Sequence, residues 1–270
     1  MTDFTVLERL ERSYDAIPRV GGALVEAVGP FELFLRQGAG WPYYARPRLG
    51  TASVTAADVE AVRSRQRSLA VPEAIEWVLD ITPSVQAAVE ETGLSVTMAP
   101  LMILDTESLS HDSDNAFLLD PDDPDFASLL AFSNAVAHLG FGNPGVAAGS
   151  GGPAERDAAV RPVEPGLLGF VADGLRSGAK AEAVVRVPGD GIVARGAFQS
   201  ALGAAEIVGV ATLPSARRQG HGAAVSALLA RVALERGNDL VFLSAASEDV
   251  ARVYARIGFR RVGTAGIAEA

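Results

Sequence analysis

The chain has 270 residues, of which 49% are hydrophobic and 21% charged, so it can form one large or two ordinary domains and is not broadly disordered. It contains no cysteine, which excludes disulfides, thiolate metal sites and a cysteine nucleophile. The net charge of −10 argues against a nucleic-acid-binding surface.

Strand and helix signals alternate over the first 110 residues, as in an α/β domain. We expect strands at residues 31–36, 43–48, 74–80, 94–96 and 101–104, and helices at 55–67 and 83–92. Thr55 is a typical N-cap residue for the first helix, and Gly93 is a typical stop for the second.

An acidic, proline-containing segment follows, and we take residues 111–126 as a linker between domains 1–110 and 127–270. No lysine or arginine occurs between Ser68 and Pro153, although many aspartates and glutamates do. Such a surface could attract a cationic amine. It could equally serve only solubility.

The region after the linker again predicts a mixture of helices and strands. Helices are expected at residues 125–139, 166–177, 220–236 and 247–257, and strands at 181–187, 191–199, 204–213, 240–244 and 260–265. The glycines between residues 142 and 153 indicate a loop within this domain. The whole chain is therefore expected to be α/β (or α+β), with a mixed sheet and flanking helices in its C-terminal half.

The most informative stretch is a strand that leads directly through an Arg- and Gly-rich turn into a long helix, at residues 206–224. The first amides of a helix have no internal partners, and the helix dipole adds positive charge there, so such a turn can bind a diphosphate. The residues after Gly222 fit neither a Walker loop, which needs Lys and then Ser or Thr, nor a dinucleotide fingerprint, since Val225 stands where a third glycine belongs.

The pattern Arg217-x-x-Gly220-x-Gly222 resembles the CoA-binding motif of the Gcn5-related N-acetyltransferase (GNAT) superfamily. A second signature follows, in which Tyr254 precedes Gly258-Phe259. The resemblance implies a GNAT fold for residues 127–270 and acetyl-CoA as cosubstrate. The implied cofactor-binding residues are Val210, Thr212, Arg217, Arg218, Gln219, Gly220, His221, Gly222 and Ala223.

Within that resemblance, main-chain amides from Gln219 to Ala223 would hold the diphosphate, and one of the two arginines would reach a phosphate. Backbone near Val210 and Thr212 would polarise the thioester carbonyl. His221 is expected to point outward from the start of the helix.

Two residues are candidates for catalysis. Tyr254 matches the tyrosine that commonly protonates the CoA sulfur in this family, although it could simply be a half-buried helix residue. Glu206 is the candidate base that accepts a proton from the amine, although it could instead be a solvent-facing strand residue. Because no cysteine can carry the acyl group, we expect direct attack in a ternary complex.

The N-terminal region lacks a Gly-x-Gly loop, yet its order of elements is like the second half of an acetyltransferase fold, with Gly93-Leu94 in place of Gly-Phe. It could be a degenerate, CoA-free copy that helps form the acceptor site. The alternative is an unrelated α/β module for dimerisation or substrate binding.

The expected function is N-acetylation of a primary amine in a small molecule or peptide. A non-catalytic acyl-CoA sensor and a plain interaction scaffold are the alternatives. We expect no metal, since His111 and His138 lack partners at ligand spacing. The expected partners are the amine acceptor and a second copy of the chain, without nucleic acid or membrane. With no leader or apolar span recognisable, a cytoplasmic location is expected.

Overall fold

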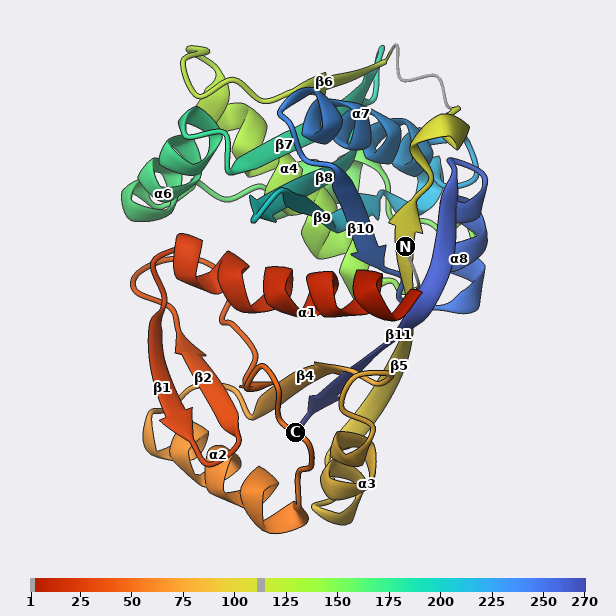
Figure 1. Cartoon of the computed structure of the whole chain (residues 1–270). Coiled ribbons are helices and arrows are strands. Elements are labelled where there is room, and N and C mark those ends of the chain that lie inside the picture. The colour runs from red at the N-terminus through yellow and green to blue at the C-terminus, as the bar shows by residue number, and fades with distance from the viewer. Residues whose placement is uncertain (1–2, 111–114) are drawn as a thin grey trace. The chain divides into compact units, whose positions relative to one another are not determined.

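The computed structural model describes residues 3–110 and 115–270. His111 lies outside the described residues. The chain forms two compact units (Figure 1). Unit 1 comprises Met1–Met102, Ser244–Ala246 and Arg261–Ala270, and unit 2 comprises Ile103–Leu243 and Ser247–Arg260. The predicted α/β class, with a mixed sheet and flanking helices, is confirmed.

Unit 1 contains a small antiparallel sheet, a second group of three strands, and helices. The small sheet has the order β1 (Leu24–Val28), β2 (Phe31–Leu35), β3 (Arg46–Pro47). The second group has the order β4 (Ala74–Val78), β11 (Phe259–Glu269), β5 (Ser95–Leu104), and the helices are α1 (Asp3–Val20), α2 (Ala56–Ser68) and α3 (Ser84–Glu91). The last residues of the chain, 265–269, pair antiparallel with β4. This is why Arg261–Ala270 belongs to unit 1 and not to the C-terminal domain in which the predicted boundaries placed it.

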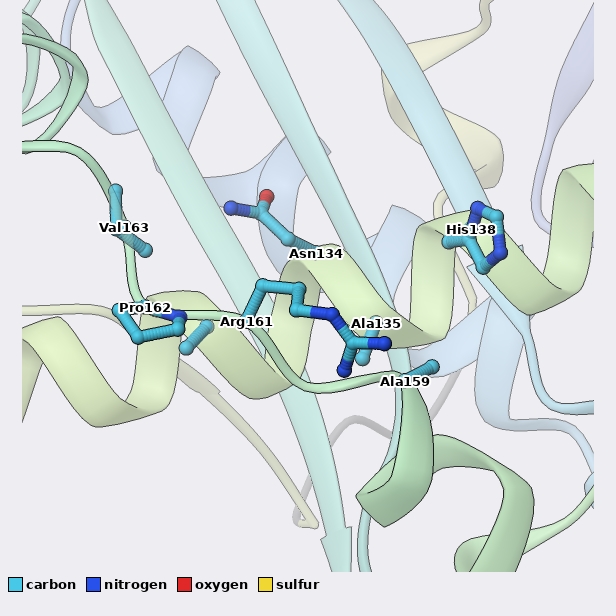
Figure 2. A pocket seen from close by; sticks show the side chains of 8 residues that line it. Asn134, Ala135, His138, Ala159, Arg161, Pro162 and Val163 are labelled. Carbon is cyan, nitrogen blue, oxygen red and sulfur yellow. The ribbon is translucent and has the colours of Figure 1, made fainter.

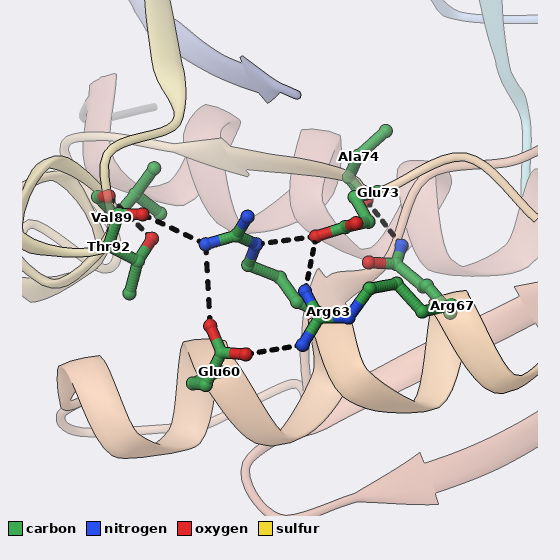
Figure 3. A network of polar contacts seen from close by, with 8 residues as sticks. Glu60, Arg63, Arg67, Glu73, Ala74, Val89 and Thr92 are labelled. Carbon is green, nitrogen blue, oxygen red and sulfur yellow. Dashed lines mark hydrogen bonds and ion pairs between the residues drawn. The ribbon is translucent and has the colours of Figure 1, made fainter.

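An ion-pair network anchors α2 in unit 1 (Figure 3). Arg63 Nε lies 2.7 Å from a Glu73 carboxylate oxygen, and Arg63 Nη1 donates to the carbonyl of Thr92 at 2.9 Å. Arg67 bridges the same Glu73 and Glu60. Exposed ion pairs contribute about 0–1 kcal/mol each to stability. The partly buried Arg63–Glu73 pair is therefore the part of this network that contributes most to holding α2 in place.

Unit 2 is built on five neighbouring strands. In sheet order they are β10 (Leu240–Ser244), β9 (Ala204–Thr212), β8 (Gly191–Ala201), β7 (Lys180–Val187) and β6 (Ala116–Leu118), and the helices are α4 (Phe126–Gly142), α5 (Pro153–Ala159), α6 (Pro165–Arg176), α7 (His221–Glu235) and α8 (Glu248–Ala255). The pairs β6–β7, β7–β8 and β8–β9 are antiparallel, whereas β9 and β10 are parallel. Because β6 pairs with β7, residues 116–118 of the predicted linker are part of this sheet.

Helices α4 and α7 pack on opposite faces of β8 and β9 (Figure 1). A Cβ on Gly140 of α4 would lie 2.9 Å from the Ala211 side chain, whereas one on Gly222 of α7 would lie 3.3 Å from the Thr212 hydroxyl. Adjacent strand residues point to opposite faces, so Ala211 faces α4 and Thr212 faces α7.

Strand β9 departs from regular pairing at two places. On its β8 side the register jumps, since Ala197 pairs with Val208 but Arg195 pairs with Ala211, and Gly209 lies in the bulge with φ of 63°. On its other side, the recorded pairs with β10 end at Phe242–Glu206. The last six residues of β9 therefore have no recorded partner on β10.

Several expected elements were found close to their predicted bounds, including the Thr55 cap of α2, the β7–β8 hairpin and α7. The helix α1 and the strand β1 were not predicted. Residues 94–96 and 101–104 were expected as separate runs but form one strand, β5.

Candidate functional site

The loop between β9 and α7 carries a run of amides with no recorded hydrogen-bond partner in the described part of the chain. A short 3-10 turn, η2 (Pro214–Ala216), leads to Arg218 and Gly220, which have φ of 64° and 84°. The first helical hydrogen bond of α7 is donated by Ala224 to the Gly220 carbonyl. For residues 218–223, no amide hydrogen bond to a described residue is recorded. These amides thus remain able to bind an anion.

The start of α7 carries no competing negative group. It has no side-chain cap and no acidic residue in its first turn. Helix α2 of unit 1 shows the opposite arrangement, because the Thr55 hydroxyl caps the Asp58 amide and the Asp58 carboxylate accepts from the Thr55 amide at 2.9 Å. A carboxylate at that helix start would repel a phosphate. Only α7 of these two helices is therefore suited to a diphosphate.

The first turn of α7 lies directly against β9. A Cβ on Gly222 would come within 3.3 Å of Thr212 Oγ1 and 3.8 Å of a Val210 methyl group. A larger residue at position 222 would separate the helix start from the strand. The sequence-predicted residues Val210, Thr212 and Gly222 are thus brought together.

The glycine-rich loop after α4 is attached to the segment that precedes the amides. The Gly149 amide donates to the Pro214 carbonyl at 3.0 Å, and the Ser215 amide donates to the Gly151 carbonyl at 2.9 Å. A Cβ on Gly149 or Gly151 would lie 3.1 to 3.2 Å from the Pro214 ring. These glycines allow two backbone segments to approach closely.

The two arginines of the loop have different environments. Arg217 donates to the carbonyls of Gly140, Asn143 and Ala147, at the end of α4 and just beyond it. It therefore anchors α4 to the loop. Arg218 is exposed, as are Gln219 and Gly220, which leaves Arg218 as the arginine available to a phosphate.

His221 is buried, with 8% of its surface exposed, so the expected outward orientation is wrong. Its Nε2 atom has no hydrogen-bond partner among residues 3–110 and 115–270. Burial lowers the pKa of His221, because desolvation disfavours the imidazolium. The side chain is therefore neutral at pH 7 and packs as part of the helix start.

We expect His221 to make the folded state sensitive to mild acid. Its pKa is lower in the folded chain than the unfolded value of about 6.5. The unfolded state therefore binds more protons near and below that pH, and the free energy of unfolding decreases as the pH is lowered. Denaturant unfolding at pH 7.5 and 5.5 should show a smaller loss for His221→Gln than for the wild type. Equal losses in the two proteins would contradict the assignment.

Tyr254 lies on α8 and is buried, with 8% exposure. Its ring meets Phe259 edge to face at 5.9 Å, and its hydroxyl shares a hydrogen bond with Ser226. Ser226 in turn donates to the Gly222 carbonyl at 2.8 Å. Burial raises the pKa of Tyr254 to about 12, so the phenol keeps its proton at neutral pH. The structure thereby links the tyrosine to the first turn of α7.

Glu206 lies on β9 and is buried, with 7% exposure, so it is not the solvent-facing residue of the alternative interpretation. Its Oε2 atom accepts a hydrogen bond from Gln199 Nε2 at 2.9 Å. It belongs to the last recorded pair between β9 and β10. The carboxylate thus stands on the strand where the two strands stop pairing.

Comparison with known proteins places these features in one fold. Residues 192–265 match the model of the FR47-like protein family. A GCN5-related N-acetyltransferase from Kribbella flavida superposes with a TM-score of 0.64 at 21% identity, covering 94% of this chain and 95% of its own. The chain has the GNAT fold. The fold expected from the two motifs is confirmed, and the segment that matches the FR47-like model contains both of them.

Two further structures share the GNAT fold over most of their length. A GCN5-related N-acetyltransferase-like protein from Streptococcus suis 89/1591 has a TM-score of 0.56 at 14% identity, covering 97% of each chain. A tandem GNAT protein from the clavulanic acid biosynthesis pathway has a TM-score of 0.52 at 13% identity, covering 94% of this chain and 87% of its own. The comparison with curated proteins gives no match. The coverage fits a two-domain GNAT arrangement.

A largely buried polar cluster on the α4 side of the GNAT sheet, formed by Ser133, Glu182 and Arg195, was not predicted from the sequence. A signal existed, since Glu182 and Arg195 fall in predicted strands. A charged residue that must face a packed helix needs a partner, and a pair of opposite sign on adjacent strands could have been proposed.

A pocket opens elsewhere in unit 2, between α4 and the segment after α5 (Figure 2). Its volume is about 420 Å³, and its lining includes Asn134, His138 and Arg161. Asn134 and His138 are exposed, whereas Ser133 and Gly140 of the same helix face the sheet. The pocket therefore lies on the outer side of α4, apart from the amides of α7.

The described residues offer neither a cluster of metal ligands nor a helix suited to spanning a membrane. No group of three or more His, Asp or Glu side chains able to hold a metal ion occurs among them. No helix in that part of the chain is both long and apolar enough to span a membrane.

Proposed function

We propose that unit 2 transfers the acetyl group of acetyl-CoA to a primary amine of a small molecule or peptide, by direct attack in a ternary complex. Two observations carry the proposal together. The amides of residues 218–223, at the start of α7, have no recorded partner among the described residues. They lie beside the part of β9, after Glu206, that has no recorded pair with β10. An anion site next to an unpaired strand edge suits a cosubstrate with a diphosphate and an extended arm.

The residues present fit that cosubstrate. The amides from Gln219 to Ala223 would bind the diphosphate, and Arg218 would add a positive charge. The edge of β9 beyond Glu206 offers backbone groups to the amide-containing arm. Acetyl-CoA supplies an activated thioester carbonyl, so the chain has to orient it and handle two protons.

Glu206 would act as the base. An alkylammonium has a pKa of about 10, so the acceptor must lose a proton before its nitrogen can attack. A buried carboxylate fixed by Gln199 suits that task. As the carbon–nitrogen bond forms and the carbon–sulfur bond breaks, Tyr254 would give its phenolic proton to the departing sulfur. The second proton, which the nitrogen loses after attack, would return to the phenolate through solvent, so that the proton on Glu206 is the one released overall.

Calorimetry with acetyl-CoA, followed by a free-thiol assay against a panel of primary amines, tests the proposal. We expect binding, and thiol release with at least one amine. Binding without thiol release across the panel would favour an acyl-CoA sensor. No binding at all would favour an interaction scaffold and contradict the proposed function.

Glu206→Gln should lower kcat by about 100-fold, in the range of general-base catalysis. The amide is isosteric and can still accept from Gln199, so the fold should be kept. Glu235→Gln on the exposed end of α7 is the matched control and should leave kcat unchanged. Full activity of Glu206→Gln would remove the base assignment and leave the cosubstrate assignment intact.

A further inference from the structure

Arg195 is placed to control the conformation of the β9 bulge. We infer that it is a positioning residue, which fixes the peptide between Gly209 and Val210 so that the Val210 amide faces the reacting carbonyl. The inference rests on the proposed function, because it concerns the same site. Its structural part can be measured without any turnover.

Arg195 is held from three directions. Its Nε donates to Ser133 Oγ at 3.1 Å, its Nη1 donates to the Gly209 carbonyl at 3.1 Å, and its Nη2 lies 2.7 Å from Glu182 Oε1. Ser133 also donates to Glu182, at 2.5 Å. These contacts join α4, β7 and β8 to the bulge of β9, so the guanidinium has a single well-defined position.

Gly209 is shaped to receive this guanidinium. Its φ of 63° is a conformation that favours glycine. A Cβ at this position would lie 2.5 Å from Arg195 Nη1, which is closer than real contacts allow. The glycine therefore serves both the bulge and the approach of the arginine.

The recorded strand pairing leaves this bulge with few ladder contacts, because a bulge leaves its extra residue unpaired. Gly209 and Val210 have no Cα partner in the β8 register, and the recorded β10 pairs end at Glu206. A peptide without a ladder on either side can rotate. The hydrogen bond from Arg195 to the Gly209 oxygen replaces the missing ladder contact.

The direction of this bond decides where the Val210 amide points. In a planar trans peptide, the C=O of one residue and the N–H of the next point in opposite directions. With the Gly209 oxygen turned toward Arg195, the Val210 N–H is turned away from it. The guanidinium lies between Gly209 and Glu182 of β7 and contacts Ser133 of α4, so the amide is directed away from β8 and from the α4 side, toward the edge on which β9 has no recorded partner.

The free energy needed to bury the Glu182–Arg195 ion pair supports a role for it beyond stability. Glu182 and Arg195 are both largely buried, with side-chain exposures of 7% and 13%. A buried ion pair is often no more stabilising than apolar residues of similar volume. The guanidinium of Arg195, however, also holds the Gly209 carbonyl, which an apolar side chain cannot do.

Arg195→Lys is the test variant, because it keeps the charge opposite Glu182 and loses the fork that reaches Gly209. We expect kcat to fall by about 100-fold, as for loss of one amide that stabilises a reacting oxygen, with the KM for acetyl-CoA nearly unchanged. Hydrogen exchange at Val208 and Ala211, which pair with β8 on either side of the bulge, should accelerate in the unliganded protein. Arg236→Lys is the matched control, since that arginine also donates to carbonyls, those of Gly178 and Lys180.

Each outcome separates the two ideas. Unchanged hydrogen exchange in Arg195→Lys would overturn the inference whether or not the protein is an enzyme. Faster exchange with unchanged kcat per folded molecule would reduce Arg195 to a structural role and also overturn it. A wild-type chain that neither binds acetyl-CoA nor turns over would overturn the proposed function and the catalytic part of this inference, while the exchange data would still decide the structural part.

Discussion

Gly220→Glu is expected to abolish measurable binding of acetyl-CoA, with at least about a 100-fold rise in Kd. A hydrogen bond to a charged group contributes about 1.5–3 kcal/mol, and two such bonds lost correspond to about two or more powers of ten. The substitution places a carboxylate at the positive end of α7 and forces a side chain onto a residue with φ of 84°. Calorimetry measures the loss.

A matched control comes from the other end of the same helix. Gly237 has φ of 83°, and a Cβ there would meet nothing within 4 Å. Gly237→Glu therefore carries a similar backbone strain without touching the amides of residues 218–223. It should bind acetyl-CoA like the wild type. If both variants bind equally well, or lose binding equally, the assignment of the α7 start as the diphosphate site is wrong.

Tyr254→Phe is expected to lower kcat by about 100-fold or more, in the range found for general acids, with the KM for acetyl-CoA within a few-fold of the wild type. The phenyl ring keeps the edge contact with Phe259, so the loss should be confined to the hydroxyl. Steady-state kinetics on an amine that is turned over provides the measurement.

The pH dependence offers an independent check on Tyr254. Burial raises its pKa to about 12, so the phenol remains protonated and the rate should show no fall from its ionisation up to about pH 10. Ser226→Ala removes the hydroxyl partner and should have a much smaller effect than Tyr254→Phe. An unchanged kcat in Tyr254→Phe would exclude the tyrosine as the acid and leave it a core residue of α8.

Local rules made much of the C-terminal half predictable. The Gly220 turn, the Ser247 cap of α8 and the β7–β8 hairpin depend on residues a few positions apart, and all are present. By contrast, helix α1 was not predicted, although its residues Leu7 and Leu10 are buried. Its buried residues Val6, Leu7, Leu10 and Tyr14 recur at helical spacing, so a periodic signal for this helix was present in the sequence.

The partners of the site residues could not be predicted. One of Arg217 and Arg218 was expected at a phosphate, and the sequence did not show that the Arg217 guanidinium is bound to carbonyls more than 60 residues earlier in the chain. The buried state of His221 and the contact between Arg195 and Gly209 likewise depend on which face of each element is covered. Side-chain pattern alone does not specify the covering element.

The sequence by itself determined that a strand passes through a glycine turn into an uncapped helix, because turn chemistry and helix capping act over a few residues. It also indicated the GNAT fold, since both motifs are short and contiguous. Only the tertiary structure decided that β9 stops pairing with β10 after Glu206 and that Arg195 braces the bulge. Strand register and buried ion pairs join residues distant in the chain, and their free energy depends on packing that no local pattern contains.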